Sequence, residues 1–244
     1  MKIINRIINR FWWIMTQNKI RQWSKDSKKS KINGYIVMYH YISDEHVPNM
    51  SESCQCTGSE FKRSINYFKN NGYTFVSLDE ALKIIHNKLQ QKFVVITFDD
   101  IPDCVYTNAY PILKQLNIPF TIYITYNFID KESFITKEHL LKLKSDPLCT
   151  IGAHTMNHPM LRHCKNSFYE IQQCKIALEG LTGCNVEHFA YPYGQLAVVS
   201  KSNINMVKTV GYKTGVSAIG APLTSESTKN LFFLPRIIIN RISY

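Results

Sequence analysis

Two adjacent carboxylates, Asp99 and Asp100, follow a strongly apolar segment of the chain. Residues 93–98 are almost all β-branched or aromatic, which is typical of a strand that is buried on both faces. Carboxylates at the end of such a strand are costly to bury unless something balances their charge. Because active sites of α/β sheets and barrels lie at the carboxyl ends of their strands, the pair indicates a metal site. The alternative is that the pair starts a turn or caps the helix after Pro102.

Two histidines, His154 and His158, follow a second short apolar segment. In a helical turn, a spacing of four residues points both imidazole rings the same way. Neutral imidazole is a good ligand for zinc and similar divalent ions, and two histidines with one carboxylate leave a coordination position open for water. We therefore expect the two histidines to share a metal ion with one carboxylate of the Asp pair.

A third segment, residues 189–194, reads Phe-Ala-Tyr-Pro-Tyr-Gly and predicts a strand that ends in a turn. Pro192 restricts the backbone there, and Gly194 permits an unusual turn. The backbone N–H of Tyr193 could then face the site and stabilise an oxyanion. A purely structural turn is the alternative interpretation.

Strand and helix patterns alternate along the chain from residue 35 onward. We expect strands at residues 35–40, 73–76, 92–98, 120–125, 148–153, 187–191, 212–217 and 231–240, and helices at residues 59–70, 78–86, 105–116, 137–144, 167–181 and 204–210. This alternation predicts an α/β fold with a parallel sheet, either open or closed into a barrel. The length suits one such domain, residues 34–244, after a distinct segment of residues 1–33.

Residues 1–33 form a basic, amphipathic segment with a polar linker. Its large apolar residues recur at helical spacing, namely Ile4, Ile7, Ile8, Phe11, Trp12 and Met15. The apolar run is too interrupted for a transmembrane span, and it lacks the continuous apolar region and cleavage site of a secretory signal. Two interpretations stay open: residues 1–30 bind an anionic membrane surface, or the helix packs on the barrel.

Charge and cysteine content indicate the partners and the compartment. The chain has 29 Lys and Arg against 18 Asp and Glu, which favours an anionic partner such as a membrane surface or an acidic glycan. We see no zinc-finger spacing, RNP-like motif or recognition-helix signature, so we expect no nucleic-acid partner. The 7 cysteines have scattered spacing, which does not suit a disulfide framework and suggests a reducing compartment. We therefore expect the protein in the cytoplasm or on the cytoplasmic face of the membrane.

The order of four motifs resembles the polysaccharide deacetylase family, the NodB-homology domain. The motifs are T-F-D-D at residues 97–100, H-T-x-x-H-P at 154–159, F-A-Y-P-Y-G at 189–194 and L-P-R-I at 234–237. The likeness spans about residues 35–240 and is nearest to the poly-N-acetylglucosamine deacetylase branch. It implies a distorted (β/α) barrel of about seven strands.

The resemblance also implies a role for each motif residue. Asp100, His154 and His158 match a metal-binding triad, which holds Zn²⁺ or another divalent ion such as Co²⁺, Ni²⁺ or Mn²⁺. Asp99 matches the general base, and Tyr193 matches the residue whose backbone N–H holds the oxyanion. The expected reaction removes the N-acetyl group from an N-acetylhexosamine unit of a polysaccharide, an oligosaccharide or a lipid-linked glycan.

The chain departs from the family pattern at three points. Its C-terminal motif lacks the histidine that usually acts as general acid, so we expect His40 to act instead, as a similar Tyr-His strand does in the poly-N-acetylglucosamine branch. Ala190 stands where an arginine is usual, and we expect Arg236 to orient Asp99 in its place. Ile101 replaces the usual glycine, which leaves the shape of that loop open. The alternative for His40 is a strand-end histidine hydrogen-bonded to a neighbour.

Two other functions stay open at the level of sequence. The same scaffold could hydrolyse a small non-glycan amide with the aid of a metal ion. The chain could also bind a glycan or a membrane without turnover. The intact Asp pair and histidine pair argue against this last function, because a binding protein needs no base beside a metal ion.

Overall fold

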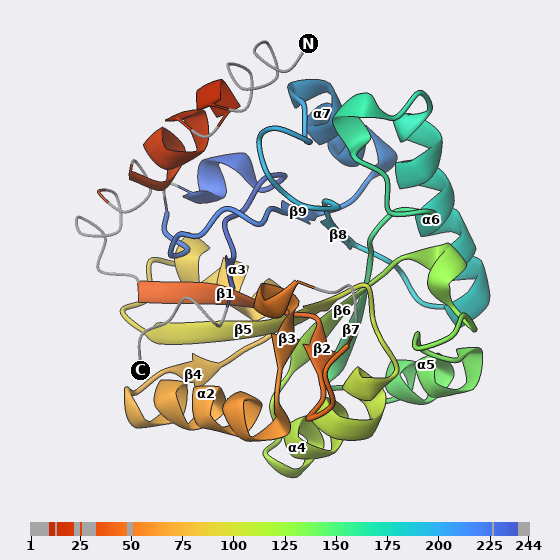
Figure 1. Cartoon of the computed structure of the whole chain (residues 1–244). Helices are drawn as coiled ribbons and strands as arrows, with labels where there is room; N and C mark the ends of the chain where they lie inside the picture. Colours follow the sequence, from red (N-terminus) through yellow and green to blue (C-terminus); the bar gives the residue numbers. More distant parts are fainter. Residues whose placement is uncertain are drawn as a thin grey trace.

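The computed structural model describes residues 10–12, 14–21, 25, 33–47, 51–225 and 227–238. Its centre is a curled parallel sheet with the strand order β10-β1-β5-β6-β7-β8-β9, and β4 pairs with β5 beside this path (Figure 1). The strands are β1 (Asn33–Tyr39), β4 (Thr74–Phe75), β5 (Lys92–Asp99), β6 (Phe120–Ile124), β7 (Cys149–Ala153), β8 (His188–Ala190), β9 (Thr214–Val216) and β10 (Ile237–Ile238). A separate pair, β2 (Tyr41–Ile42) and β3 (Gln55–Cys56), was not predicted from the sequence.

The C-terminal segment closes the sheet into a barrel. Leu234 forms a parallel bridge with Val216 of β9, and its carbonyl oxygen accepts a hydrogen bond from the N–H of Ser217 at 2.8 Å. A few residues later, β10 pairs in parallel with β1 at the other end of the strand order. The predicted distorted barrel of about seven strands is thereby confirmed. The prediction of one continuous strand at residues 231–240 is wrong for its described part, which ends at residue 238. This segment pairs first with β9 and then with β1.

Strand β5 runs through the middle of the sheet, between β1 and β6. Residues 93–99 are all buried, which explains the apolar run of the sequence. Val94, Ile96 and Phe98 belong to the main core cluster, while Phe93 and Val95 belong to a second cluster. Because side chains alternate between the faces of a strand, Asp99 lies on the face of Phe93 and Val95.

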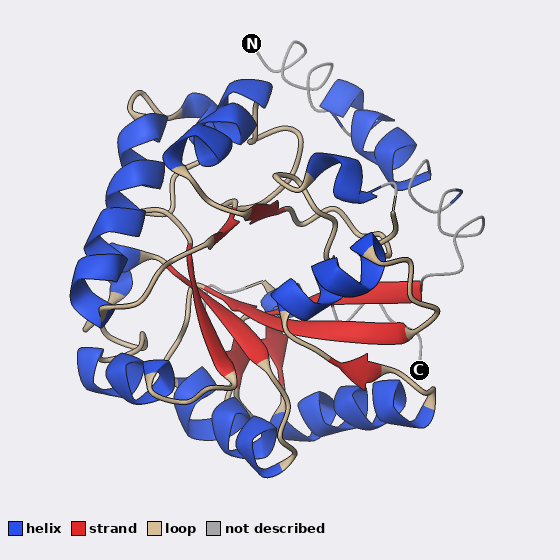
Figure 2. Ribbon diagram, turned by 180° about the vertical axis from the view of Figure 1, so that it is seen from behind, coloured by secondary structure: helices blue, strands red, loops and turns tan. Residues whose placement is uncertain are grey.

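The helices are α2 (Gly58–Asn70), α3 (Leu78–His86), α4 (Tyr110–Gln115), α5 (Lys137–Lys144), α6 (Ser167–Thr182) and α7 (Lys201–Val210). Figure 1 shows α2, α4, α5 and α6 around the outside of the curled sheet. Helix α3, seen crossing in front of the strands in Figure 2, contributes Leu78, Ala81 and Ile85 to the second cluster. The ends of these helices are capped, for example by a capping box at Ser77 and by a left-handed glycine at Gly183.

Three helix predictions need correction. The helix expected at residues 105–116 begins as a π-helical turn, Val105–Ala109, and Pro111 then stands in the first turn of α4. Helix α7 starts at Lys201 rather than at Ile204, because Ser200 caps it. Phe168 of α6 was expected to face the core but is 39% exposed. An inward position of that helix is taken instead by a carboxylate, Glu170, which is 7% exposed.

The described part of the N-terminal segment is helical at residues 10–12 and 14–21. The guanidinium of Arg162 lies 4.3 Å from the centroid of the Trp12 ring, and Ile20 packs against the main core. On the same helix, Phe11, Ile14 and Met15 are 42% to 52% exposed. The segment therefore packs on the barrel through some side chains and leaves a second apolar surface open. Residues 1–9 of the predicted amphipathic helix lie outside the described residues.

Candidate active site

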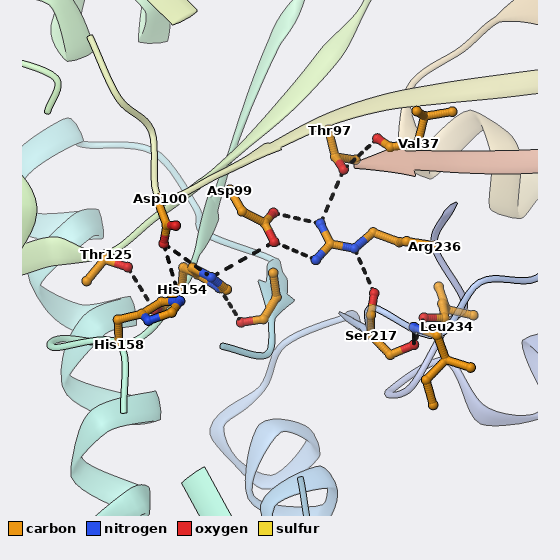
Figure 3. Close-up of polar contacts among 12 residues, drawn as sticks. Val37, Thr97, Asp99, Asp100, Thr125, His154, His158, Ser217, Leu234 and Arg236 are labelled. Carbon is orange, nitrogen blue, oxygen red and sulfur yellow. Dashed lines mark hydrogen bonds and ion pairs between the residues drawn. The ribbon is translucent and has the colours of Figure 1, made fainter. Parts of the chain in front are cut away.

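The side chains predicted to carry chemistry come together from three parts of the barrel (Figure 3). Asp99 ends β5 and Asp100 follows it, while His154 and His158 lie in the loop after β7. Arg236 immediately precedes β10. β5 and β7 are parallel, so their carboxyl ends lie at one edge of the sheet. Arg236 lies at the amino end of β10, and its long side chain reaches Asp99 from there.

Asp100, His154 and His158 form a group that could hold a metal ion. Their ligand atoms all lie within 4.8 Å of one another. Asp100 Oδ1 is 3.6 Å from His154 Nε2 and 3.3 Å from His158 Nε2. This oxygen is buried and has no hydrogen-bond partner among the described residues. A buried carboxylate oxygen without a donor, facing two imidazoles, fits a cation ligand.

The protonation of the group suits a metal ion as well. His154 Nδ1 lies 2.8 Å from the carbonyl oxygen of Ala190, so Nδ1 carries the proton and the Nε2 lone pair faces the site. Burial lowers the pKa of His154 to about 3 and that of His158 to about 4, so both rings are neutral near pH 7. Burial raises the pKa of Asp100 to about 6, with His40 opposing the shift and Asp99 adding to it. A cation in the group would favour the ionised form of Asp100.

The two histidines are not presented by a helical turn, and that prediction is wrong. The loop contains two residues with left-handed backbone, Thr155 at a φ of 72° and His158 at a φ of 56°. The N–H of His158 donates to Thr155 Oγ1 at 2.9 Å, which closes the loop on itself. The two imidazole rings converge because the backbone of the loop reverses its direction. In a helix they would converge because residues four apart lie on the same face.

The loop after Asp99 also has a left-handed backbone. Asp100 has a φ of 61° and Ile101 a φ of 53°, a conformation that is a strained outlier for a β-branched residue. Ile101 is only 1% exposed, and its carbonyl oxygen accepts a hydrogen bond from the N–H of Ile135 at 3.1 Å. Burial of the side chain and this hydrogen bond therefore hold the loop in a shape that is usually left to glycine.

Asp99 is bound by Arg236 through both of its oxygens. Arg236 Nη1 donates to Asp99 Oδ1 and Nη2 donates to Oδ2, each at 2.6 Å. The remaining guanidinium bonds reach the carbonyl oxygen of Ser217 at 2.8 Å and Thr97 Oγ1 at 3.2 Å (Figure 3). Burial raises the pKa of Asp99, but Arg236 and then His154 outweigh it, so that its pKa falls to about 2. Asp99 is therefore ionised across the whole working range of pH.

His40 and Tyr193 lie on the edges of this group. His40 follows β1, and its Nδ1 is buried with no hydrogen-bond partner among the described residues. Tyr39, the last residue of β1, pairs with Phe98 of β5, so His40 follows β1 beside Asp99. Its interaction with Asp99 and Asp100 favours the ionised forms of both carboxylates. Tyr193 has a φ of 60°, and the centroid of its half-exposed ring is 4.8 Å from that of His158.

Comparison with known proteins shows the family of the chain. A family model described as polysaccharide deacetylase matches residues 86–215. The chain belongs to the polysaccharide deacetylase family. The family expected from the four motifs is thereby confirmed, and curated relatives of the chain are named N-deacetylases, which are hydrolases that act on carbon–nitrogen bonds.

Individual relatives of this polysaccharide deacetylase cover most of its length. The chain is 28% identical to a poly-β-1,6-N-acetyl-D-glucosamine N-deacetylase of Staphylococcus aureus, over 87% of this chain and 75% of the relative. The deacetylase PplD of Streptococcus pyogenes, solved in complex with acetate, is 25% identical with a TM-score of 0.73, over 84% of this chain and 91% of that one. A polysaccharide deacetylase from Bacillus cereus, at 22% identity and a TM-score of 0.73, shares the fold over 84% of this chain and 65% of that one.

The structure adds supporting roles that the motifs of this polysaccharide deacetylase did not predict. Thr97 and Ser217 bind the guanidinium of Arg236. Glu170 of α6 binds Asn157, the residue before His158. The sequence contains only a weak signal for Glu170, namely a carboxylate at a core-facing position of an amphipathic helix.

Proposed function

We propose that this chain hydrolyses the N-acetyl group of N-acetylglucosamine units in a β-1,6-linked polymer. The observation that carries the proposal is the meeting of Asp100, His154 and His158 beside an ionised carboxylate, Asp99. The substrate is proposed from the activity for which the Staphylococcus aureus relative is named. A lipid-linked or shorter glycan with the same sugar would present the same acetamide group.

The triad would hold a divalent ion, which we propose to be Zn²⁺. When bound, this ion polarises the acetamide carbonyl and lowers the pKa of a water molecule. The neutral histidines and the unpartnered Asp100 oxygen supply the ligand set that such an ion prefers. Co²⁺, Ni²⁺ and Mn²⁺ accept similar ligands.

Asp99 is the proposed general base. Its Oδ2 lies 3.9 Å from His154 Nε2, so the carboxylate borders the triad. Each carboxylate oxygen has two lone pairs, and the fork of Arg236 uses one on each. A lone pair therefore stays free to take a proton from the attacking water. Arg236 keeps the carboxylate in one orientation throughout the reaction.

His40 is the proposed general acid. The reaction adds water to the acetamide carbon and then breaks its bond to nitrogen, and the leaving nitrogen must gain a proton. His40 is the titratable group that borders the Asp pair from β1, and its Nδ1 has no partner among the described residues. The backbone N–H of Tyr193 is the proposed donor to the oxyanion. The products are acetate and a free amine on the sugar.

The test is acetate release from β-1,6-linked N-acetylglucosamine oligomers by metal-stripped protein, with and without added Zn²⁺ or Co²⁺. We expect release only with metal, and none from Asp99→Asn protein that still binds the metal. A β-1,4-linked oligomer of equal length is the control for linkage. Absence of acetate from every oligomer, despite one bound metal ion per chain, would contradict the proposed substrate.

We also propose that the N-terminal helix binds the anionic, cytoplasmic surface of a membrane. Exposed Phe11, Ile14 and Met15 lie on a helix that also carries exposed Arg10 and Arg21. A helix with these features suits a membrane interface. The 7 cysteines have a scattered spacing that does not suit a disulfide framework, which favours the reducing side of the membrane. Among the described residues, no helix is long and apolar enough to cross a membrane.

The membrane proposal is tested by sedimentation with lipid vesicles. Wild-type protein should sediment with vesicles that contain phosphatidylserine and stay in solution with purely phosphatidylcholine vesicles. A Phe11→Ser, Met15→Ser variant should lose binding, whereas Leu116→Ser, an equally exposed apolar residue elsewhere, should keep it. Equal sedimentation of both variants would contradict the proposal.

A further inference from the structure

Glu170 is a buried carboxylate outside the triad, on the core-facing side of α6. It is 7% exposed. Both of its oxygens accept hydrogen bonds from one residue, Asn157. The backbone N–H of Asn157 donates to Oε2 at 2.9 Å, and Asn157 Nδ2 donates to Oε1 at 2.8 Å. Carboxylates are rarely buried unless they are paired in this way, so the partner of Glu170 indicates its task.

Asn157 links Glu170 to the loop that carries the histidines. It precedes His158 directly in the chain. Its Oδ1 accepts a hydrogen bond from Asn127 Nδ2 at 2.7 Å, and the N–H of Asn127 donates to the carbonyl oxygen of Met156 at 3.0 Å. Residues 156 and 157 are thus held from two sides, by α6 and by the loop after β6.

The two histidines of the triad are not held equally. His154 is 1% exposed, its N–H donates to the carbonyl oxygen of Ile124 at 2.8 Å, and its Nδ1 is bound to Ala190. His158 has a left-handed backbone and partly exposed ring. A residue with such a backbone persists only where its surroundings hold it in place. The hydrogen bonds to Asn157 hold the backbone in place next to His158.

We propose that Glu170 is a positioning residue for the metal site. Through Asn157 it keeps the loop folded so that His158 Nε2 faces Asp100. The inference rests on the proposed function, because it concerns the same triad. Outer groups that orient metal ligands typically change metal affinity by about 10-fold to 100-fold when they are lost. We expect a loss of that size without Glu170, and little change in the position of His154.

To hold Asn157 in this way, the side chain at position 170 needs two hydrogen-bond acceptor atoms. In Glu170→Gln protein, the amide oxygen can still accept the backbone N–H of Asn157, but the NH₂ group faces another donor, Asn157 Nδ2. A flip of the Asn157 amide would relieve this clash and would turn its NH₂ group toward Asn127 Nδ2 instead. Glu170→Met keeps the length of the side chain and removes both acceptors. The effect should therefore grow from Glu170→Gln to Glu170→Met.

The experiment measures Co²⁺ binding to the full chain. Affinity is obtained by competition with a chelator, the visible absorption spectrum of bound Co²⁺ reports the ligand geometry, and the melting temperature reports stability. The matched control is Glu179→Gln on the same helix, where Glu179 pairs with Lys175 at 2.9 Å and accepts from the N–H of Val186 at 3.0 Å. This control removes the charge of a carboxylate on the same helix without touching Asn157.

We expect Glu170→Met to bind Co²⁺ about 10-fold to 100-fold more weakly, with a changed spectrum, while Glu179→Gln keeps both at wild-type values. If Glu170→Met does not fold, Glu170→Gln and Asn157→Ala decide, and both should bind more weakly than the control. Wild-type affinity and spectrum in the folded Glu170 variants would overturn the inference and leave the metal site intact. Failure of the wild-type chain to bind Co²⁺ would instead contradict the proposed function itself.

Discussion

Arg236 binds both oxygens of Asp99 at 2.6 Å, although 137 positions separate the two residues in the chain. Arg236 is fully buried and Asp99 is 2% exposed, so neither charge can be balanced by water. Arg236 also lies on the segment that closes the barrel, just after Leu234 bridges to Val216 of β9. Closure of the fold and orientation of the proposed base therefore depend on the same few residues.

Replacement of Arg236 by lysine should show whether Asp99 needs only a positive charge beside it or also the planar shape of the guanidinium. Lysine keeps the positive charge but cannot reproduce the planar fork, so Asp99 gains rotational freedom. We expect the rate of acetate release to fall by about 100-fold, the scale set by a small misplacement of a catalytic group. Bound metal should stay near one ion per chain. Lys229→Arg, on the exposed turn Ser227–Asn230, is the control. An Arg236→Lys protein with wild-type turnover would show that the fork has no catalytic role.

Removal of His40 should affect turnover more than metal binding. A general acid contributes about 10²-fold to 10⁴-fold to the rate, so His40→Ala should slow acetate release on that scale. Metal content, measured by atomic emission, should be almost unchanged because His40 is not in the triad. His46→Ala, at an exposed position of the same region, should behave like wild type. Parallel loss of metal and activity would mark His40 as a ligand or a structural residue instead.

Divalent metal should stabilise the fold through the triad. A ligand that binds only the folded state raises the free energy of unfolding by about 2.7 kcal/mol when its free concentration is about 100 times its Kd. We expect urea unfolding of metal-stripped protein to show this increase when Zn²⁺ is added. Asp100→Asn removes the charged ligand and should abolish most of it. An equal increase in the Asp100→Asn protein would locate the bound ion elsewhere.

Ile101→Gly tests how strain and burial balance in the loop after Asp99. Glycine adopts the left-handed backbone freely, which recovers about 1–3 kcal/mol of strain. Loss of a fully buried isoleucine side chain costs about 2–5 kcal/mol, and the freer unfolded chain adds about 1 kcal/mol. We expect the variant to be less stable by about 1–3 kcal/mol on chemical denaturation. Increased stability would mean that strain, and not packing, dominates at this position.

Much of the local structure could be predicted from sequence because its causes are short-range. The alternation of apolar segments predicted the strands, and the helices predicted at residues 78–86 and 137–144 start directly after Ser77 and Thr136, whose side chains cap them. The apolar run before Asp99 predicted a buried central strand with carboxylates at its end. These signals act within a few residues, so they survive in the sequence as patterns.

Tertiary structure decided the features that depend on distant or strained contacts. Sequence predicted a helical turn between His154 and His158, but the loop folds back through left-handed residues that hydrogen bonds from α6 and from Asn127 support. The partner of Glu170 and the closing path of residues 231–238 could not be read from any local pattern. Each of them depends on which segments the closed barrel brings side by side, and those segments lie far apart along the chain. Sequence by itself thus determined which groups could do the chemistry, and the packed barrel decided how they are aimed.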